Sequence, residues 1–190
     1  MHRRAAVLTA VLAIAVAAPL TPPVTALQQP ESLAPYVPTP YDVVNRMLEL
    51  AEVTRDDVVY DLGCGDGRIV ITAAERFGAR GVGIDYDPER IAEANANAAR
   101  RGVQDLVTFI QQDAMQADVS EATVVTLYLL SSSNRRLRPL LTRQLRPGAR
   151  IVSHAFRMGD WRPDVTHEFD DERGTMRTLH LWRADGVVRP

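Results

Sequence analysis

The sequence predicts an α/β fold in which a mostly parallel sheet carries helices on both faces and ends in an antiparallel hairpin. Short apolar runs rich in β-branched residues alternate along the chain with segments whose apolar residues recur at helical spacing. The last two strand-like runs follow each other directly around an acidic turn, with no helical segment between them. Seven strands are expected in all.

The first half of the chain should form an amphipathic helix followed by strand–helix repeats. The expected elements are helices over 42–51, 69–77 and 88–101, and strands over 58–62, 81–85 and 106–110. The run 58–62 is short, apolar and β-branched, as in a strand buried on both faces. Gly78 can end the second helix, and Asp87 followed by Pro88 is a typical start for the third.

The second half should complete the sheet and close it with the hairpin. A strand over 123–130, a helix over 134–145 and a strand over 150–155 are expected, with Pro147 and Gly148 forming the turn before the last of these. Strands over 165–169 and 176–182 then flank an acidic turn over 170–174. Ligands of such sheets bind at the carboxyl ends of the parallel strands.

Three alternating glycines follow the first predicted strand. Gly63, Gly65 and Gly67 permit a tight turn and close approach of the backbone to a ligand, because glycine has no Cβ. Dinucleotide-binding folds use G-x-G-x-x-G at this point, with pyrophosphate at the helix N-terminus. This chain has G-x-G-x-G, and Arg68 occupies the position of the third dinucleotide glycine.

Carboxylates around the glycine loop favour a cationic ligand. Asp61 flanks the loop and Asp66 lies within it, and two carboxylates beside a pyrophosphate would repel it. They suit S-adenosylmethionine, which carries an ammonium and a sulfonium. Asp85 ends the next strand about 20 residues after the glycines, where nucleotide-binding folds place the acid that holds ribose hydroxyls. A dinucleotide oxidoreductase remains the alternative, to be tested by NAD binding.

Four segments in order give the chain a resemblance to the class I S-adenosylmethionine-dependent methyltransferases, which have a Rossmann-like fold. These segments are 61–67, 83–85, 112–114 and 145–152. The resemblance implies that Asp61 contacts the methionine amino group, Asp85 the ribose hydroxyls and Asp113 the adenine amino group. The cofactor-binding residues that we predict are Tyr41, Asp61, Gly63, Gly65, Gly67, Asp85, Tyr86, Asp113 and Ala114.

A closer resemblance appears before the first strand. The chain is similar to the mitochondrial ATP-synthase c-subunit lysine methyltransferases and their bacterial relatives in three segments. These are 34–48, 66–71 and 150–156 with Trp161 just beyond it. This similarity implies N-methylation of a protein lysine, with Tyr36, Thr39 and Tyr41 closing over the cofactor. The segment 129–134 lacks the acid and prolines that amine methyltransferases often carry there. A small-molecule methyltransferase and a non-catalytic cofactor-binding domain remain alternatives.

Methyl transfer from a sulfonium is an in-line displacement that depends mainly on alignment of the reacting atoms. Tyr128 and Asn134 are the catalytic candidates, and His154 is a third residue on the expected substrate side. Each has a structural alternative: Tyr128 as a half-buried strand aromatic, Asn134 as a helix cap and His154 as a buried structural histidine. No metal site is expected.

Composition limits the other function classes. The net charge is −2, which gives no electrostatic case for nucleic-acid binding. The 22 basic residues are all arginine. Cys64 is the single cysteine, so an intramolecular disulfide is excluded, and a small residue fitting a tight turn is a better interpretation than a nucleophile.

The N-terminal region predicts a targeting segment. Residues 1–26 combine a basic start, an apolar run and small residues that resemble a signal-peptidase site, so they are expected to be a signal peptide or an N-terminal membrane anchor. A proline-rich linker over 27–40 and the methyltransferase domain over 41–185 should follow. We therefore expect an exported or membrane-anchored protein, or a cytoplasmic one if an uncleaved anchor faces inward. Its substrate would be a small molecule or a protein that could be membrane-associated.

Overall fold

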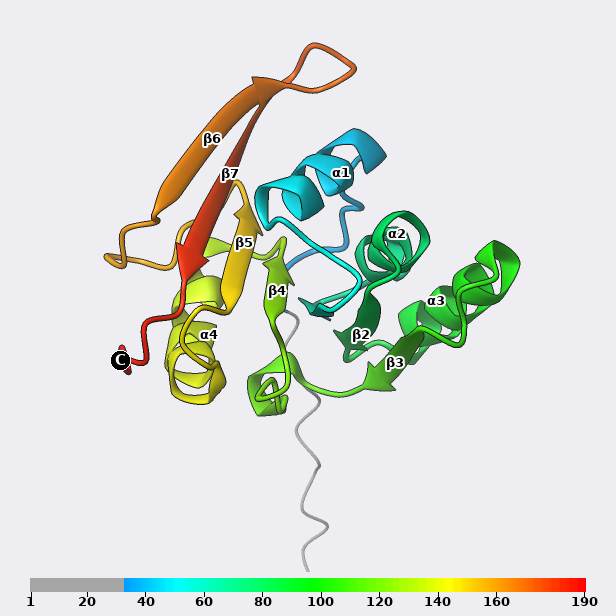
Figure 1. Ribbon diagram of the computed structural model, residues 1–190, viewed down its shortest axis with the longest axis horizontal. Helices are drawn as coiled ribbons and strands as arrows, with labels where there is room; N and C mark the ends of the chain where they lie inside the picture. The colour runs from blue at the N-terminus through cyan, green and yellow to red at the C-terminus, as the bar shows by residue number, and fades with distance from the viewer. Residues whose placement is uncertain (1–32) are drawn as a thin grey trace, which may run out of the picture.

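A computed structural model describes residues 33–190 and shows one seven-stranded sheet in the order β3-β2-β1-β4-β5-β7-β6 (Figure 1). The strands are β1 (Val58–Leu62), β2 (Arg80–Asp85), β3 (Val107–Gln111), β4 (Val124–Leu127), β5 (Arg150–His154), β6 (Val165–Asp170) and β7 (Met176–Arg183). The first five are parallel, and β7 pairs antiparallel with both β5 and β6. The predicted fold class, including the closing hairpin, is confirmed.

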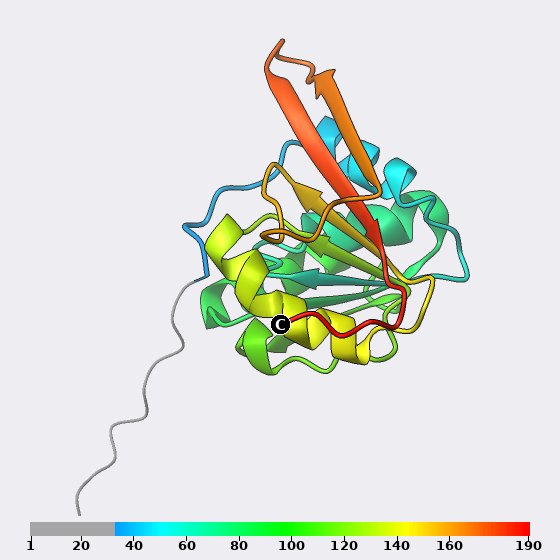
Figure 2. The same ribbon diagram turned by 90° about the vertical axis from the view of Figure 1, so that its left-hand side faces the viewer.

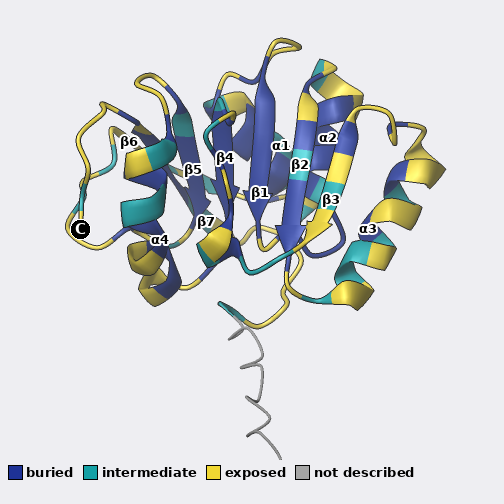
Figure 3. Cartoon of the chain, turned by 90° about the horizontal axis from the view of Figure 1, so that it is seen from below, coloured by how far each residue is buried: buried dark blue, intermediate teal, exposed yellow. Residues whose placement is uncertain are grey.

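Helices cover both faces of the sheet, and each face has its own hydrophobic core. The helices are α1 (Tyr41–Leu50), α2 (Arg68–Phe77), α3 (Pro88–Arg101) and α4 (Ser131–Gln144), with a short 3-10 helix η1 (Ala114–Gln116). One core joins α1, α2 and α3 to the sheet, and the other joins α4 and η1 to its opposite face. Along β1, Val59 belongs to the first core, whereas Val58 and Leu62 belong to the second. Figure 3 shows the resulting buried centre of the sheet.

The region after β4 differs from the sequence-based boundaries. The strand was expected to reach residue 130, but its last pair with β5 joins Leu127 to Ser153, and residues 128–130 leave the sheet. Helix α4 begins at Ser131, three residues before the expected start, with Leu130 as an N-cap that makes no side-chain capping hydrogen bond. The early exit from β4 places Tyr128 at the edge of the sheet rather than inside it.

Strand β2 packs unusually close to its neighbours. A Cβ at Gly83 would lie 2.6 Å from the Phe109 ring and 2.9 Å from the Cys64 sulfur. A Cβ at Gly81 would lie 2.7 Å from Cβ of Val70. Both glycines therefore allow helix and strand side chains to sit directly on the backbone of β2.

The β6–β7 hairpin extends beyond the rest of the sheet (Figures 1 and 2). His154, the last residue of β5, pairs with Leu179, so the first residues of β7 project past the carboxyl end of β5. Helix α1 supports the projecting part: Asp42 accepts a hydrogen bond of 2.7 Å from the Glu172 N–H, and the Arg46 guanidinium lies 5.5 Å from the centre of the Phe169 ring.

The prediction of an exported or membrane-anchored protein is corrected. Over residues 33–190, no helix has the length and apolar character needed to cross a membrane. Residues 1–26, on which that prediction depended, lie outside the described residues. The boundary between a linker over 27–40 and a domain over 41–185 stays a prediction.

Candidate functional site

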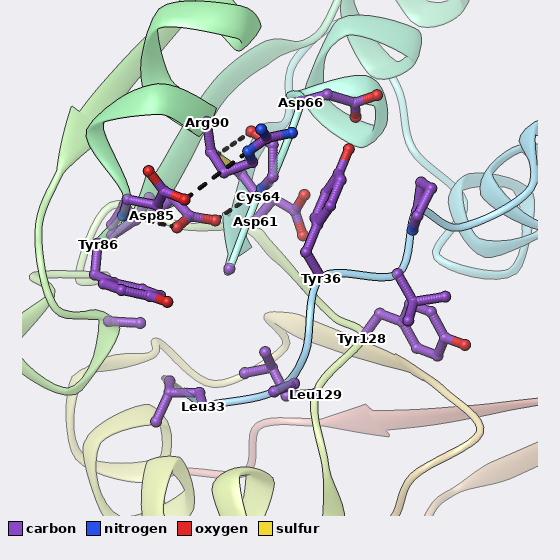
Figure 4. Close-up of a pocket in the computed structure, with 18 of the residues that line it drawn as sticks. Leu33, Tyr36, Asp61, Cys64, Asp66, Asp85, Tyr86, Arg90, Tyr128 and Leu129 are labelled. Carbon is purple, nitrogen blue, oxygen red and sulfur yellow. Dashed lines mark hydrogen bonds and ion pairs between the residues drawn. The ribbon is translucent and has the colours of Figure 1, made fainter. Parts of the chain in front are cut away.

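A pocket of about 260 Å³ lies at the carboxyl ends of β1, β2, β3 and β4 (Figure 4). This is the edge at which parallel α/β sheets bind ligands. Most of the residues that we predicted for the site line it: Asp61, Gly63, Gly65, Asp85, Tyr86, Asp113, Ala114 and Tyr128. Side chains from four different strand ends therefore meet in one cavity.

The glycine loop adopts backbone angles that few other residues accept. Gly63, Gly65 and Gly67 have φ values of 81°, 53° and 79°. The N–H groups of Gly63 and Cys64 both donate to the carbonyl of Ile84, at 2.8 and 3.0 Å, which ties the loop to the end of β2. Gly67 lies outside the pocket lining and serves as the N-cap of α2.

Asp85 is held in place by the loop that it faces. One carboxylate oxygen accepts from the Gly65 N–H at 2.9 Å, and the other accepts from the Asp87 N–H at 3.0 Å. Each oxygen keeps a second lone pair, so the carboxylate can still accept from a pair of hydroxyl groups. Asp113 is fixed similarly, because it caps η1 through the Met115 N–H at 2.9 Å.

Asp61 is a buried acid without a cationic partner among the described residues. Its carboxylate accepts a hydrogen bond of 2.8 Å from the Thr126 hydroxyl. Burial, together with the nearby charges of Asp85 and Asp66, raises the pKa of Asp61 to about 7, against the Thr126 hydrogen bond, which lowers it. A ligand that brings a positive charge to this position would stabilise the ionised form of Asp61.

Arg68 fixes the other flank of the loop. Its guanidinium forms a bidentate pair with Asp66, at 2.6 to 3.1 Å, and donates to the carbonyl of Thr39 at 2.8 Å. Tyr41, a predicted cofactor contact, lies outside the pocket lining, and its exposed ring covers Arg68 at 5.0 Å. Tyr41 therefore packs against the loop through Arg68.

Residues 33–39, which we name the strap, lie across the pocket and contribute to its wall. The Tyr36 ring sits over Gly65, where a Cβ would come within 2.6 Å of it, and the Arg90 guanidinium lies 4.6 Å from the ring centre. The Ser133 hydroxyl donates to the carbonyl of Leu33 at the start of the strap. Sequence reasoning missed Arg90, although its place in the first turn after Asp87 put it beside the loop.

Cys64 lines the pocket but is not suited to act as a nucleophile. Its thiol is buried, and burial together with Asp61 and Asp85 raises its pKa far above the ordinary range. Its sulfur instead packs beside Gly83.

The candidates for the substrate side occupy different places in the structure. Tyr128 lines the pocket, and its ring stacks on His154 with centres 4.0 Å apart. Asn134 is fully buried outside the pocket lining and donates to Ser153 and to the carbonyl of Phe156. Burial, with a smaller contribution from Arg177, lowers the pKa of His154 to about 4, so its imidazole is neutral at neutral pH.

Comparison with known proteins identifies the family. The model of the ANTKMT methyltransferase domain matches residues 61–165. A protein-lysine N-methyltransferase of Saccharolobus islandicus is 49% identical over 150 residues, covering 78% of this chain and 92% of that protein. The chain belongs to the ANTKMT methyltransferase family.

Two further comparisons concern a human relative and a solved structure. The human lysine N-methyltransferase named for the ATP-synthase c-subunit is 31% identical over 82% of this methyltransferase and 66% of its own length. The crystal structure of a protein named an RNA methyltransferase, from Salinibacter ruber, contains S-adenosyl-L-homocysteine. It is 56% identical with a TM-score of 0.75, covering 80% of this chain and 97% of that one.

The methyltransferase depends on S-adenosylmethionine, and its pocket fits that cofactor. Gly63 and Gly65 leave space that a Cβ would fill. Asp61 has no cationic partner among the described residues, and an ammonium group would provide one. Asp85 and Asp113 present carboxylates on the side of the pocket toward β2 and β3. Residue by residue, the contacts to the cofactor stay predictions.

Proposed function

We propose that this methyltransferase transfers a methyl group to the side-chain amine of a protein lysine. The relatives named as lysine methyltransferases support the acceptor class. The charge of the pocket agrees with a cationic acceptor. Five aspartates line the pocket, Asp61, Asp66, Asp85, Asp87 and Asp113, together with two arginines, Arg68 and Arg90.

Both arginines are already paired with acids. Arg68 is held by Asp66, and Arg90 donates to Glu93 at 2.5 Å. The pocket therefore presents net negative charge to an incoming molecule. Such a field attracts a cationic lysine and repels a nucleic-acid backbone, which needs basic residues to neutralise its phosphates. The relatives named as lysine methyltransferases are the observation that carries the proposal.

Each strand end has a proposed part in the reaction. Asp61 would hold the methionine ammonium, Asp85 the ribose hydroxyls and Asp113 the adenine amino group. When bound, S-adenosylmethionine supplies a methyl group that is already activated by the sulfonium. The lysine ammonium first loses its proton to solvent, because only the neutral amine can attack, and S-adenosylhomocysteine leaves as the new N–C bond forms. The protein has to align the amine with the methyl group, and such alignment can account for about 7–11 kcal/mol of the barrier. Tyr128, at the β4 end of the pocket, is the residue we place beside the incoming amine.

The test is methyl transfer from radiolabelled S-adenosylmethionine to two acceptor pools, total cell protein and total cell RNA. The chain contains no lysine, so methyl-lysine found after acid hydrolysis comes from the substrate and not from the enzyme. We expect label in lysine of the protein pool, identified by mass spectrometry of the labelled band. Label in the RNA pool alone would overturn the proposal in favour of the activity named for the Salinibacter relative.

Asp85→Ala is the control for the cofactor site. Removal of the carboxylate should weaken binding of S-adenosylmethionine by at least about tenfold, because hydrogen bonds to a charged group contribute about 1.5–3 kcal/mol. Unchanged affinity in isothermal titration calorimetry would show that the ribose does not lie at Asp85.

A further inference from the structure

The turn that ends β5 has a backbone conformation that alanine rarely adopts. Ala155 has a φ of 65°, and across residues 33–190 only one other non-glycine residue, Glu52, has a positive φ. The Phe156 N–H donates to the carbonyl of His154 at 2.8 Å, which closes a three-residue γ-turn around Ala155. Such turns with positive φ are strained and persist where neighbouring groups hold them.

Two buried side chains hold this turn. The carbonyl of Phe156 accepts from the Asn134 amide at 3.0 Å and from the Ser153 hydroxyl at 2.7 Å. The same amide donates to the Ser153 oxygen at 3.1 Å, and both side chains are fully buried. A carbonyl with two donors is strongly oriented, so Asn134 and Ser153 fix the direction in which the chain leaves β5.

His154 and Phe156, on either side of Ala155, and Tyr128, which follows β4, form three neighbouring rings, which we name the aromatic wall. The rings of Tyr128 and His154 stack with centres 4.0 Å apart and planes 24° apart. The Phe156 ring lies 6.3 Å from that of Tyr128. Tyr128 is the ring of the wall that lines the pocket, and it lies at the end of the pocket away from Asp85 and Tyr86 (Figure 4).

The order of the strands places this wall opposite the nucleoside end of the pocket. Asp113 follows β3, Asp85 is the last residue of β2, Asp61 lies in β1, and Tyr128 follows β4, next to β5. A cofactor with its adenosine near Asp85 and its ammonium near Asp61 therefore has the aromatic wall beside its methionine end. The acceptor has to reach the sulfonium methyl group, which lies toward the methionine end of the cofactor.

We propose that Tyr128, the ring of the aromatic wall that lines the pocket, is the subsite for the acceptor amine, with the buried His154 stacked behind it, and that Asn134 and Ser153 are the positioning residues of the wall. Aromatic faces bind an ammonium or methylammonium group while giving it no hydrogen bond that would have to be broken before reaction. Asn134 therefore acts through the turn rather than on the substrate. It is also not a helix cap, because the N-cap of α4 is Leu130. The chemical class of the ligand rests on the proposed function.

The experiment uses n-butylamine as a mimic of the lysine side chain, with the intact protein loaded with S-adenosylhomocysteine. Aromatic NMR resonances of Tyr128 and His154, assigned with Tyr128→Phe and His154→Gln variants, report on the wall directly. We expect both to shift on titration in the wild type. In Asn134→Ala we expect butylamine to bind at least about fivefold more weakly, which corresponds to a cation–aromatic contact of about 1 kcal/mol.

Two further variants separate positioning from a general loss of stability. Gln144→Ala, on the same helix, loses side-chain hydrogen bonds to Val119 and Ala117 but leaves the wall untouched, so it should bind butylamine as the wild type does. Adding Ala155→Gly to Asn134→Ala should restore part of the affinity, because glycine accepts the positive φ without strain.

Affinity for S-adenosylhomocysteine should stay within about twofold of the wild type in Asn134→Ala, since that residue lies outside the pocket lining. Absence of any shift of Tyr128 and His154 in the wild type would overturn the subsite. Equal butylamine affinity in Asn134→Ala and Gln144→Ala would overturn the positioning role. Neither result depends on whether a protein substrate has been found. Failure of this subsite can therefore be distinguished from failure of the proposed lysine methylation.

Discussion

Asp61 is a buried carboxyl group whose ionisation is unfavourable until a cation arrives. It receives one hydrogen bond, from Thr126, and lies near the charges of Asp85 and Asp66. Under the proposed function, the methionine ammonium compensates for this charge when the cofactor is bound. At this scale, function and stability oppose each other, as they commonly do in binding sites.

Binding of S-adenosylmethionine should weaken as the pH falls through 7. With a pKa of about 7 in the free protein, Asp61 must release a proton before it can pair with the ammonium. We expect the affinity to fall by up to about tenfold per pH unit below pH 6, where the carboxyl group is mostly protonated. Calorimetry between pH 5.5 and 7.5 measures this, since the ammonium of the cofactor stays charged there. The Asp61→Asn variant should bind weakly with a flat profile, and a wild-type slope in that variant would contradict the assignment.

The same substitution should stabilise the free protein at alkaline pH. The pKa of Asp61 is higher in the folded than in the unfolded chain, so its contribution to stability is present in acid and is lost as the pH rises through 7. Asp61→Asn removes that loss, and we expect the free energy of unfolding at pH 8 to rise by about 1–2 kcal/mol. Denaturant unfolding at pH 8 and pH 5 provides the comparison, and a destabilised variant at pH 8 would show that the charge is already compensated.

At the scale of elements, the strap and the glycine loop form one unit through Arg68. This side chain joins Asp66, in the loop, to the carbonyl of Thr39, which lies 29 residues earlier. A planar guanidinium can make both contacts at once, whereas an ammonium provides a single charged centre.

Arg68→Lys should therefore loosen the strap without removing the charge. We expect S-adenosylmethionine affinity to fall by about three- to tenfold, because the bidentate pair and the contact to Thr39 cannot both be kept. Hydrogen exchange of residues 33–39 should become faster in the same variant. Arg76→Lys is the matched control on α2, since Arg76 makes an exposed pair with Glu49 away from the pocket. Equal exchange rates in the two variants would contradict the link.

Gly83 sets the distance between β2 and the residues on either side of it. A methyl group there would collide with Phe109 and Cys64. Gly83→Ala should lower the free energy of unfolding by about 1–3 kcal/mol, as for other overpacked core positions. Gly102→Ala is the contrast: its φ of 70° strains an alanine, but no atom lies within 4 Å of the added methyl group. Denaturant unfolding should show the larger loss for Gly83, and the opposite order would mean that β2 can shift.

At the scale of the whole molecule, a second buried aspartate links several elements to one another at the edge of the sheet opposite the pocket. Asp57 accepts from the Thr123 hydroxyl at 2.6 Å, the Thr54 N–H at 2.7 Å and Arg150 at 2.9 Å. Arg150 also donates to the carbonyl of Ala51 at the end of α1. One ion pair thus connects α1 with the segments leading into β1, β4 and β5. Burial alone would raise the pKa of Asp57, but these hydrogen bonds hold it below its ordinary value.

Asp57→Asn should have the opposite effect to Asp61→Asn. The lowered pKa of Asp57 means that its contribution to stability is present above the ordinary aspartate pKa and is lost as the pH falls through the lower, folded-state value. We expect the variant to lose about 2–3 kcal/mol at pH 7 and less near pH 3, with S-adenosylmethionine affinity unchanged in the folded protein. A loss of cofactor affinity would mean that this edge is coupled to the pocket.

Local patterns predicted the parts of this molecule that depend on neighbours in sequence. Strand and helix periodicity, the glycines of the loop and the acids that end β1 and β2 all follow from residues within one strand–turn–helix unit. The parallel sheet then brings those acids together, because the carboxyl ends of parallel strands lie on one edge. The pairing of Arg68 with Asp66 is of the same local kind, since the two residues lie two positions apart.

Long-range contacts could not be predicted in the same way. Tyr41 was predicted to contact the cofactor, and the structure places its ring over Arg68, outside the pocket lining. Asn134 was a candidate for the substrate side, with a helix cap as its alternative, and the structure shows its amide holding the turn at Phe156, 22 residues away. In each case the partner is chosen by packing between distant segments, and no local pattern records which of several polar groups will be met.

The sequence by itself predicted the fold class, the family through its resemblance to known methyltransferases, and the acids that make the pocket suited to a cationic cofactor, because each follows from motifs and their spacing along the chain. Only the tertiary structure decided that Tyr128, His154 and Phe156 share one wall and that the turn at Ala155 is held in strain. Those facts depend on where β4 leaves the sheet and on buried hydrogen bonds from α4 to the end of β5. Such bonds form because a buried polar group must find a partner wherever the fold places it.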